Sequence, residues 1–198
     1  MPKVASRRVA LQLMAAAAMF AAVPMVAPAV AADPSQIVQN TAQQVIEIVK
    51  SKTGADRQAA ILGVLQTSFD MPAMARAALG THWNQATEQE RTRFLKAVAT
   101  AEAKAYSERF GQYGGQTLTI GKVTPRANGV TIVDSRLNQT SGQPIKLEWE
   151  VRGDRITDVK VEGVSMVMTR RSDFNSYIQN HGGKVEPLVS ELEARAAR

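Results

Sequence analysis

The chain has 198 residues, of which 24 are basic and 18 acidic, and it contains no cysteine. The basic residues are scattered, without a basic helix stripe or an aromatic stacking motif, so the sequence does not favour a nucleic-acid-binding protein. The missing cysteines exclude a thiol nucleophile, a cysteine-liganded zinc site and an acylated lipoprotein anchor.

Residues 1–32 are predicted to be a signal peptide. Lys3, Arg7 and Arg8 precede a long apolar run that ends in the small residues Ala29-Val30-Ala31-Ala32, which is typical of a cleavage site. We therefore expect export to the periplasm, with cleavage near Ala32. The general secretory route is favoured, and the paired arginines leave twin-arginine export open. Residues 33–198 then form a single domain with 21 basic and 18 acidic residues, a net charge of +3.

The first half of this domain is predicted to be helical. Apolar residues recur at helical spacing over residues 35–52, and a second helix is predicted over residues 56–67. Asp70 is a helix N-cap residue type, and Gly80 ends the short helix that follows it.

A long amphipathic helix follows, and after it the periodicity changes. Thr87 and Glu90 form a capping-box pattern at its start, and Gly114-Gly115 is expected to end it. Beyond these glycines the apolar residues alternate with polar ones, which indicates strands. The clearest case is residues 145–152, in which every second residue is apolar and those between are charged.

We predict four antiparallel strands joined by short turns and followed by two helices. The last strand is expected to start at Arg155 and to continue through Gly163 to Met168. Ser172 is expected to cap the next helix, and the C-terminal helix covers residues 185–197. A sheet with one apolar face must be covered, so the predicted fold is α+β, with a curved antiparallel sheet of about four strands packed against several helices and an apolar cavity between them.

Few residues are candidates for catalysis. His82 and His181 each adjoin a helix-ending glycine, far apart in the chain, and are expected at the surface or at helix caps. Asp134 and Asp158 lie on predicted strands, where a carboxylate inside a cavity could act as a general base. A salt bridge from Asp134 to a nearby arginine such as Arg136 is the favoured alternative. We predict no catalytic residue and no metal site.

Two stretches of the chain carry more information than their periodicity. They are residues 69–83 and residues 158–166, the second containing Glu162-Gly163-Val164-Ser165. Together they resemble the phospholipid-binding MlaC proteins of the maintenance-of-lipid-asymmetry system, also called toluene-tolerance auxiliary proteins. The resemblance extends over nearly all of the chain after residue 32, in consistent order.

This resemblance implies a periplasmic carrier with an NTF2-like or MlaC-like fold, without enzymatic activity or a cofactor. Its cargo would be glycerophospholipid. Its partners would be an inner-membrane ABC transporter with an MCE-domain subunit and an outer-membrane lipoprotein complex, and the carrier itself would be a monomer. Three alternatives stay open: a hopanoid-associated carrier of the same family, a small-molecule isomerase or hydrolase in a cone-shaped α+β fold, and a lipid-free adaptor between two envelope complexes.

A lipid carrier needs many apolar residues around its cargo and no particular polar constellation. The resemblance places Val164 on the cavity wall, and the predicted strand and helix faces supply the rest, although a bulge at Gly163 would reverse the phase of the last strand. The predicted lipid-binding residues are Val133, Leu147, Trp149, Val164, Met166, Met168, Phe94, Val98, Tyr106 and Phe110.

Overall fold

A computed structural model describes residues 33–197, so the predicted signal peptide lies outside the described residues. The domain opens with α1 (Pro34–Ser51), whose N-cap Asp33 accepts a hydrogen bond from the Ser35 backbone N–H at 2.9 Å. The next helix is α2 (Gly54–Ser68). Both helices lie within about a turn of their predicted bounds, because periodic apolar residues define them.

The next three helices also begin and end at local sequence signals. Asp70 caps α3 (Met71–Leu79) by accepting from the Ala73 N–H at 3.0 Å, and Gly80 ends α3 with a positive φ of 60°. After the single turn of α4 (His82–Gln85), the predicted capping box is present at the start of α5 (Glu88–Phe110), with both of its hydrogen bonds. This long helix ends at Phe110, several residues before the predicted glycine pair.

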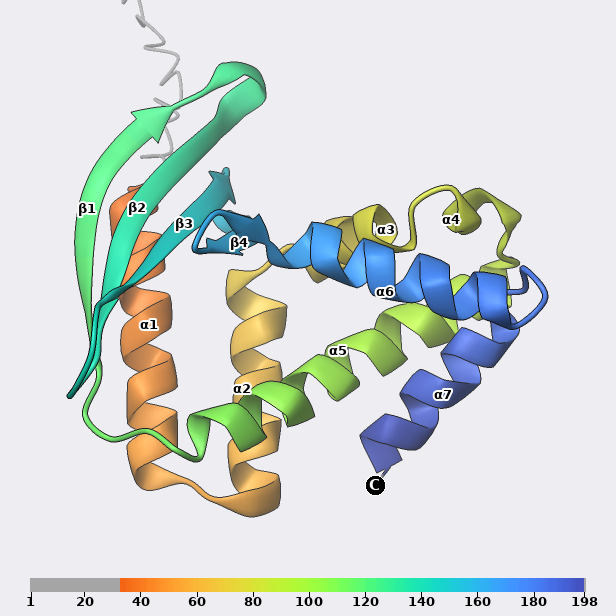
Figure 1. Ribbon diagram of the computed structural model, residues 1–198, viewed down its shortest axis with the longest axis horizontal. Helices are drawn as coiled ribbons and strands as arrows, with labels where there is room; N and C mark the ends of the chain where they lie inside the picture. Colours follow the sequence, from red (N-terminus) through yellow and green to blue (C-terminus); the bar gives the residue numbers. More distant parts are fainter. Residues whose placement is uncertain (1–32, 198) are drawn as a thin grey trace, which may run out of the picture. The chain divides into compact units, whose positions relative to one another are not determined.

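The strands form one antiparallel meander, and its order in space is the order in the chain. The described part of the chain contains the strands β1 (Thr117–Pro125), β2 (Val130–Asn138), β3 (Ile145–Arg152), β4 (Arg155–Val161) and β5 (Val164–Ser165). A short 3₁₀ turn, Ala127–Gly129, joins the first two strands. The sheet is curved (Figure 1). These features confirm the predicted fold class.

The prediction for the end of the sheet is wrong. Glu162 and Gly163 have φ values of 50° and 82°, so the chain reverses after β4 and pairs back as β5. Ser165 then acts as an N-cap, accepting from the Met168 N–H at 3.0 Å, and α6 (Met166–Asn180) begins where a strand was predicted. The expected cap at Ser172 therefore lies inside the helix.

The last helix, α7 (Glu186–Ala197), agrees with its predicted span to within one residue. It packs against α5, while α6 packs against α3. The sheet is covered from one side: α1 contacts β1 and β2, and α2, α3 and α6 each contact β4 (Figure 1). Within residues 33–197, no helix combines the length and the apolar character needed to cross a bilayer.

Buried apolar side chains gather in three separate clusters. The bundle cluster joins α3, α5, α6 and α7 around Phe94 and Ile178. The sheet cluster joins α1 to the strands around Val38 and Val133. The α2–α5 cluster forms around Ile61. A domain of this size usually has one contiguous core. Here the core is divided, and several apolar side chains that pack against the clusters are only partly buried.

Candidate functional site

The two faces of the sheet differ in chemistry. The register pairs Val133 with Trp149 and Ser135 with Leu147, which places these four side chains on one face, here called the inner face. The inner face carries the sheet cluster and is the face that the helices cover. Apolar residues at every second position of β3 therefore build one continuous apolar surface, as the alternation predicts.

The cover over this inner face is incomplete. Val133, Val151 and Ile156 are almost fully buried beneath Val38 of α1. Leu147, farther along β3, is only half-buried. The apolar surface thus extends beyond the region that side chains of the helices fill.

Trp149 lies between these two regions and is also half-buried. Its indole Nε1–H donates to the Ser135 Oγ at 2.8 Å, and Ser135 itself is buried. Because this hydrogen bond satisfies the polar atom of Trp149, the rest of the ring offers an apolar surface without an unpaired donor.

The C-terminal half of α5 supplies a second group of half-buried apolar side chains. Tyr106 and Phe110 stack with their ring centroids 5.7 Å apart and pack against the α2–α5 cluster. Burial raises the pKa of the Tyr106 hydroxyl, and the nearby Glu102 carboxylate raises it further. Tyr106 follows Glu102 by four positions on α5, so the two side chains are neighbours on the helix surface.

An ion pair joins α5 to α6 beside Tyr106. The Arg170 guanidinium donates to both carboxylate oxygens of Glu102, with the Nη2–Oε2 hydrogen bond at 3.1 Å, and its Nη1 donates to Asp173 at 3.2 Å. The hydrogen bonds that Arg170 donates to Glu102 raise the pKa of Arg170. Glu102 and Arg170 are far apart in the sequence, and no local pattern predicted this contact.

The other predicted helix residues lie elsewhere. Phe94 and Val98 are buried in the bundle cluster, where Phe94 meets Phe174 edge to face at 5.6 Å between ring centroids. The structure does not bring them into the sheet cluster with Leu147 and Trp149. The periodicity placed Phe94, Val98 and Tyr106 on one apolar stripe. However, α5 is long enough for its two halves to pack in different clusters.

The segment around Gly163 contains the remaining three predicted residues. Met166 and Met168 are not on a strand; they occupy the first turn of α6. Val164 is 57% exposed and Met168 is 55% exposed, whereas Met166 is half-buried. The structure therefore places Val164 and Met168 on the surface near the start of α6.

Asp158 has a structural position. Its buried carboxylate accepts hydrogen bonds from the backbone N–H of Val159 at 2.8 Å and from that of Val167 at 3.1 Å. The second of these groups belongs to the first turn of α6, whose N–H groups have no partner within the helix. Asp158 thus joins β4 to α6, a role that its strand position did not predict.

The outer face of the sheet is polar and carries Asp134. A concavity of about 700 Å³ there is lined by Asp134 together with charged residues that include Lys146 and Glu148. The hydrogen bond from Lys146 lowers the pKa of Glu148. Within residues 33–197 no salt bridge joins Asp134 to Arg136, so that prediction is wrong: the strand turns both side chains outward into a row of other charges.

The two histidines differ. His181 is exposed and caps the C-terminus of α6, as predicted. His82 is buried, contrary to the prediction, because the turn after α3 carries it against α6, where its Nε2 lies 2.9 Å from the Asn175 Oδ1. Across the described residues, no group of three or more His, Cys, Asp or Glu side chains could hold a metal ion.

Comparison with known proteins gives two findings. A family described as MlaC protein matches residues 39–194. A solved structure of a phospholipid-binding protein from Ralstonia solanacearum, in complex with a phospholipid, is similar in fold, with a TM-score of 0.71 and 20% sequence identity. The match covers 84% of this chain and 98% of the other.

Proposed function

This chain belongs to the MlaC family, and from that premise we propose that it is a carrier of glycerophospholipid. One observation carries the proposal: the apolar side chains of the inner face continue along β3 past the fully buried Val151, and Leu147 and Trp149 are only half-buried. The phospholipid bound by the structurally similar Ralstonia protein supports the same class of ligand.

Burial divides the predicted lipid-binding residues into three groups. Fully buried side chains already have packing partners, so we assign them to the supporting wall: Val133, Phe94 and Val98. Half-buried side chains have surface left for a ligand, and we assign the acyl-chain contacts to Leu147, Trp149, Tyr106, Phe110 and Met166. Exposed side chains are assigned to the rim: Val164 and Met168.

The free energy of exposing acyl chains to water determines how completely such a site must enclose them. Each methylene removed from water contributes about 0.8 kcal/mol, so two acyl chains with some 30 methylenes require roughly 24 kcal/mol of shielding. A carrier must approach the affinity of a bilayer closely enough to take lipid up and also to release it. We propose that the helices on either side of the Glu102–Arg170 ion pair separate to admit the chains, because this pair joins α5 to α6 beside Tyr106.

The finer assignment follows from the family. We propose that the protein acts in the periplasm as a monomer without a cofactor. It would exchange phospholipid with an inner-membrane ABC transporter carrying an MCE-domain subunit and with an outer-membrane lipoprotein complex. Asp134, the residue on which a catalytic alternative depends, lies on the outer face of the sheet, opposite to Leu147 and Trp149, and this favours a carrier over an enzyme.

Native mass spectrometry tests the proposal. The protein, purified from bacterial cells without detergent, should retain a species with the mass of a glycerophospholipid, and acyl-chain analysis should identify it. A lipid-free adaptor or a small-molecule enzyme would be isolated empty, so a homogeneous empty protein contradicts the proposal. Transfer of labelled phospholipid between donor and acceptor vesicles then separates a carrier from a protein that only retains lipid.

A further inference from the structure

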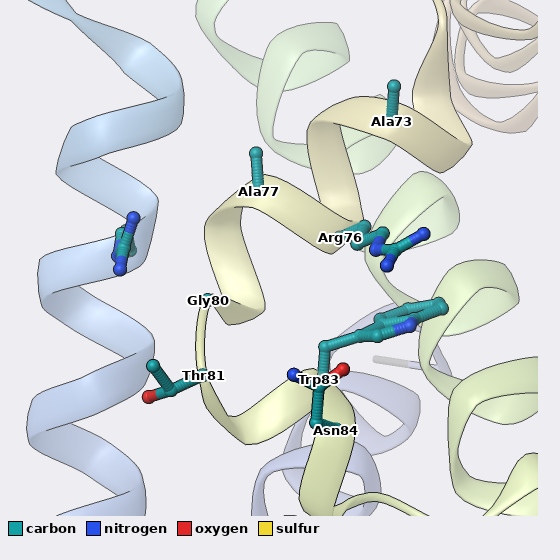
Figure 2. A pocket seen from close by; sticks show the side chains of 8 residues that line it. Ala73, Arg76, Ala77, Gly80, Thr81, Trp83 and Asn84 are labelled. Atoms are coloured by element: carbon teal, nitrogen blue, oxygen red, sulfur yellow. The ribbon is translucent and has the colours of Figure 1, made fainter.

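A second hollow lies apart from the inner face of the sheet. It has a volume of about 460 Å³ and is formed by α3, the turn that contains α4, and α6. The alanines of α3 form one side of it, and Figure 2 shows the Arg76 side chain beside the Trp83 ring. The residues that line the hollow are Ala73, Arg76, Ala77, Gly80, Thr81, Trp83, Asn84 and Arg171. We call this hollow the arginine pocket.

Both arginines of this pocket lack a carboxylate partner. Within residues 33–197, neither Arg76 nor Arg171 forms a salt bridge, whereas Arg93 and Arg170 are each held by two acidic side chains. No acidic residue lines the arginine pocket. Two positive charges therefore face one hollow without compensation from the protein.

Both arginines are exposed, and each has a neighbouring group on one side. The guanidinium carbon of Arg76 lies 5.9 Å from the centroid of the Trp83 ring. Arg91 lies 5.4 Å from the same centroid and donates to the Trp83 carbonyl at 2.8 Å, which fixes the indole. On the other side, a Cβ atom on Gly80 would lie only 2.9 Å from the Arg171 Nε, so the glycine leaves room for that guanidinium.

A guanidinium carries several N–H donors in a planar fork that fits the oxygens of phosphate or carboxylate. Thr81 and Asn84 add a hydroxyl and an amide to the same lining. The hollow is open to solvent, so a group that stays attached to a larger molecule can reach it. The arginine pocket is therefore suited to an anionic group.

Exposed apolar side chains next to the pocket favour an anion that is attached to hydrocarbon. Met168 precedes Arg171 by three positions on α6, so the two side chains are neighbours on the helix surface. Met168 is more than half exposed, and so is Val164 just before the helix begins. An acidic protein segment needs no such apolar neighbours, whereas a phospholipid has hydrocarbon next to its phosphate.

We infer that the arginine pocket binds the phosphodiester of a phospholipid, with Met168 and Val164 in contact with the adjoining hydrocarbon. Arg171 contributes to this pocket, while its neighbour Arg170 pairs with Glu102 toward Tyr106, so the phosphodiester site is separate from the acyl-chain contacts assigned above. The inference rests on the proposed function for the class of ligand only.

Titration with a headgroup tests this site directly. The chain has two tryptophans, and the part of the emission change that W83F abolishes is assigned to Trp83 inside the pocket. Glycerophosphoethanolamine, which has the phosphodiester without acyl chains, should bind and change the Trp83 emission. Inorganic phosphate should bind more weakly than glycerophosphoethanolamine if the site is selective for a phosphodiester. Vesicles of phosphatidylglycerol and phosphatidylethanolamine should bind more tightly than the headgroup, because Met168 and Val164 then also find a partner.

R76Q/R171Q should weaken the binding of glycerophosphoethanolamine and of vesicles by about tenfold or more, since charged hydrogen bonds to the phosphate are lost. The matched control is R136Q/R152Q, which removes two exposed arginine charges from the sheet. It should bind as the parent does. R171Q alone is the milder variant, because the part of the chain that the structure describes shows no salt bridge of the Arg171 side chain that the substitution would break, unlike that of its neighbour Arg170.

Three results would overturn the inference: no binding of the headgroup or vesicles to the parent, equal loss in both double variants, or binding of a glutamate-rich peptide in place of the phosphodiester. Native mass spectrometry of R76Q/R171Q and of the parent shows whether lipid is retained, and so tests the proposed function separately from the phosphodiester site. Retained lipid with lost headgroup binding supports both proposals. Retained lipid in a parent that does not bind the headgroup rejects the phosphodiester site alone.

Discussion

At the scale of single residues, Leu147 and Ile132 allow the two faces of the sheet to be tested separately. Both are half-buried aliphatic side chains in neighbouring strands, but Leu147 lies on the inner face and Ile132 lines the outer concavity. The same substitution at the two positions therefore asks whether lipid depends on the inner face or only on an intact sheet.

L147E should lower lipid occupancy by about tenfold or more, because a carboxylate next to acyl chains has no partner to offset its dehydration. Occupancy is measured by native mass spectrometry of protein purified from cells. I132E is the control and should keep its lipid, since the outer face is already charged and open to water. Equal lipid content in the two variants would mean that the inner face does not hold the cargo.

Asp158 is the residue that connects the sheet to α6, through its hydrogen bond with the Val167 N–H. D158A should lower the free energy of unfolding by about 1–2 kcal/mol, the usual effect of losing a helix cap. Urea unfolding followed by circular dichroism measures it. D154A, at an exposed aspartate in the β3–β4 turn, should change stability by no more than about 0.5 kcal/mol. If D158A is as stable as D154A, Asp158 does not stabilise the connection between the sheet and α6.

At the scale of helices and strands, an acidic clamp holds α7 against α5. Arg93 of α5 pairs with Glu186 at 2.8 Å and with Glu193 at 2.7 Å, both on α7. The hydrogen bond from Arg93 lowers the pKa of Glu193. A carboxyl group with a lowered folded-state pKa stabilises the fold fully above its unfolded pKa of about 4.3, and this contribution is lost as the pH falls through the lower folded value.

The thermal midpoint of the protein should therefore fall on acidification below about pH 4, and R93Q should reduce the part of that decrease that comes from the clamp. Differential scanning calorimetry across this pH range is the measurement. R195Q is the control, because Arg195 pairs with Glu191 within α7 and does not join the two helices. If R93Q and the parent show the same slope of Tm against pH, the clamp does not contribute.

At the scale of the whole molecule, the three hydrophobic clusters are joined through few shared side chains. Phe69 packs against both the sheet cluster and the α2–α5 cluster. A ligand between the clusters would add apolar contacts that the protein alone lacks. Such a ligand binds the folded state and not the unfolded chain, so it stabilises the fold by mass action.

Removal of bound lipid should therefore lower Tm, on the order of 5 °C if the ligand contributes about 2 kcal/mol. Calorimetry before and after extraction with a hydrophobic resin measures the change, and phospholipid added back should restore the original value. L147E should show little response to the same treatment. An unchanged Tm after complete extraction from the parent would argue against a ligand that bridges the clusters.

The sequence by itself determined the elements whose signals are local. The Thr87–Glu90 capping box, the Asp70 cap and the alternation along β3 each depend on residues within a few positions of one another, and each prediction was confirmed. The α+β class followed from these elements, because a sheet with one apolar face must be covered by the helices that flank it. The resemblance to the MlaC family was also present in the sequence, and the family match confirmed it.

Only the tertiary structure decided how these elements meet. The alternation from Val164 to Met168 suited a strand, but the turn at Gly163 and the capping groups of Ser165 and Asp158 made it the start of a helix. Val133 and Leu147 follow the same alternation, yet Val133 is buried in the sheet cluster with Val38 of α1, whereas Leu147 is only half-buried. Periodicity shows which face of an element is apolar, whereas its cover depends on packing between segments distant in the chain.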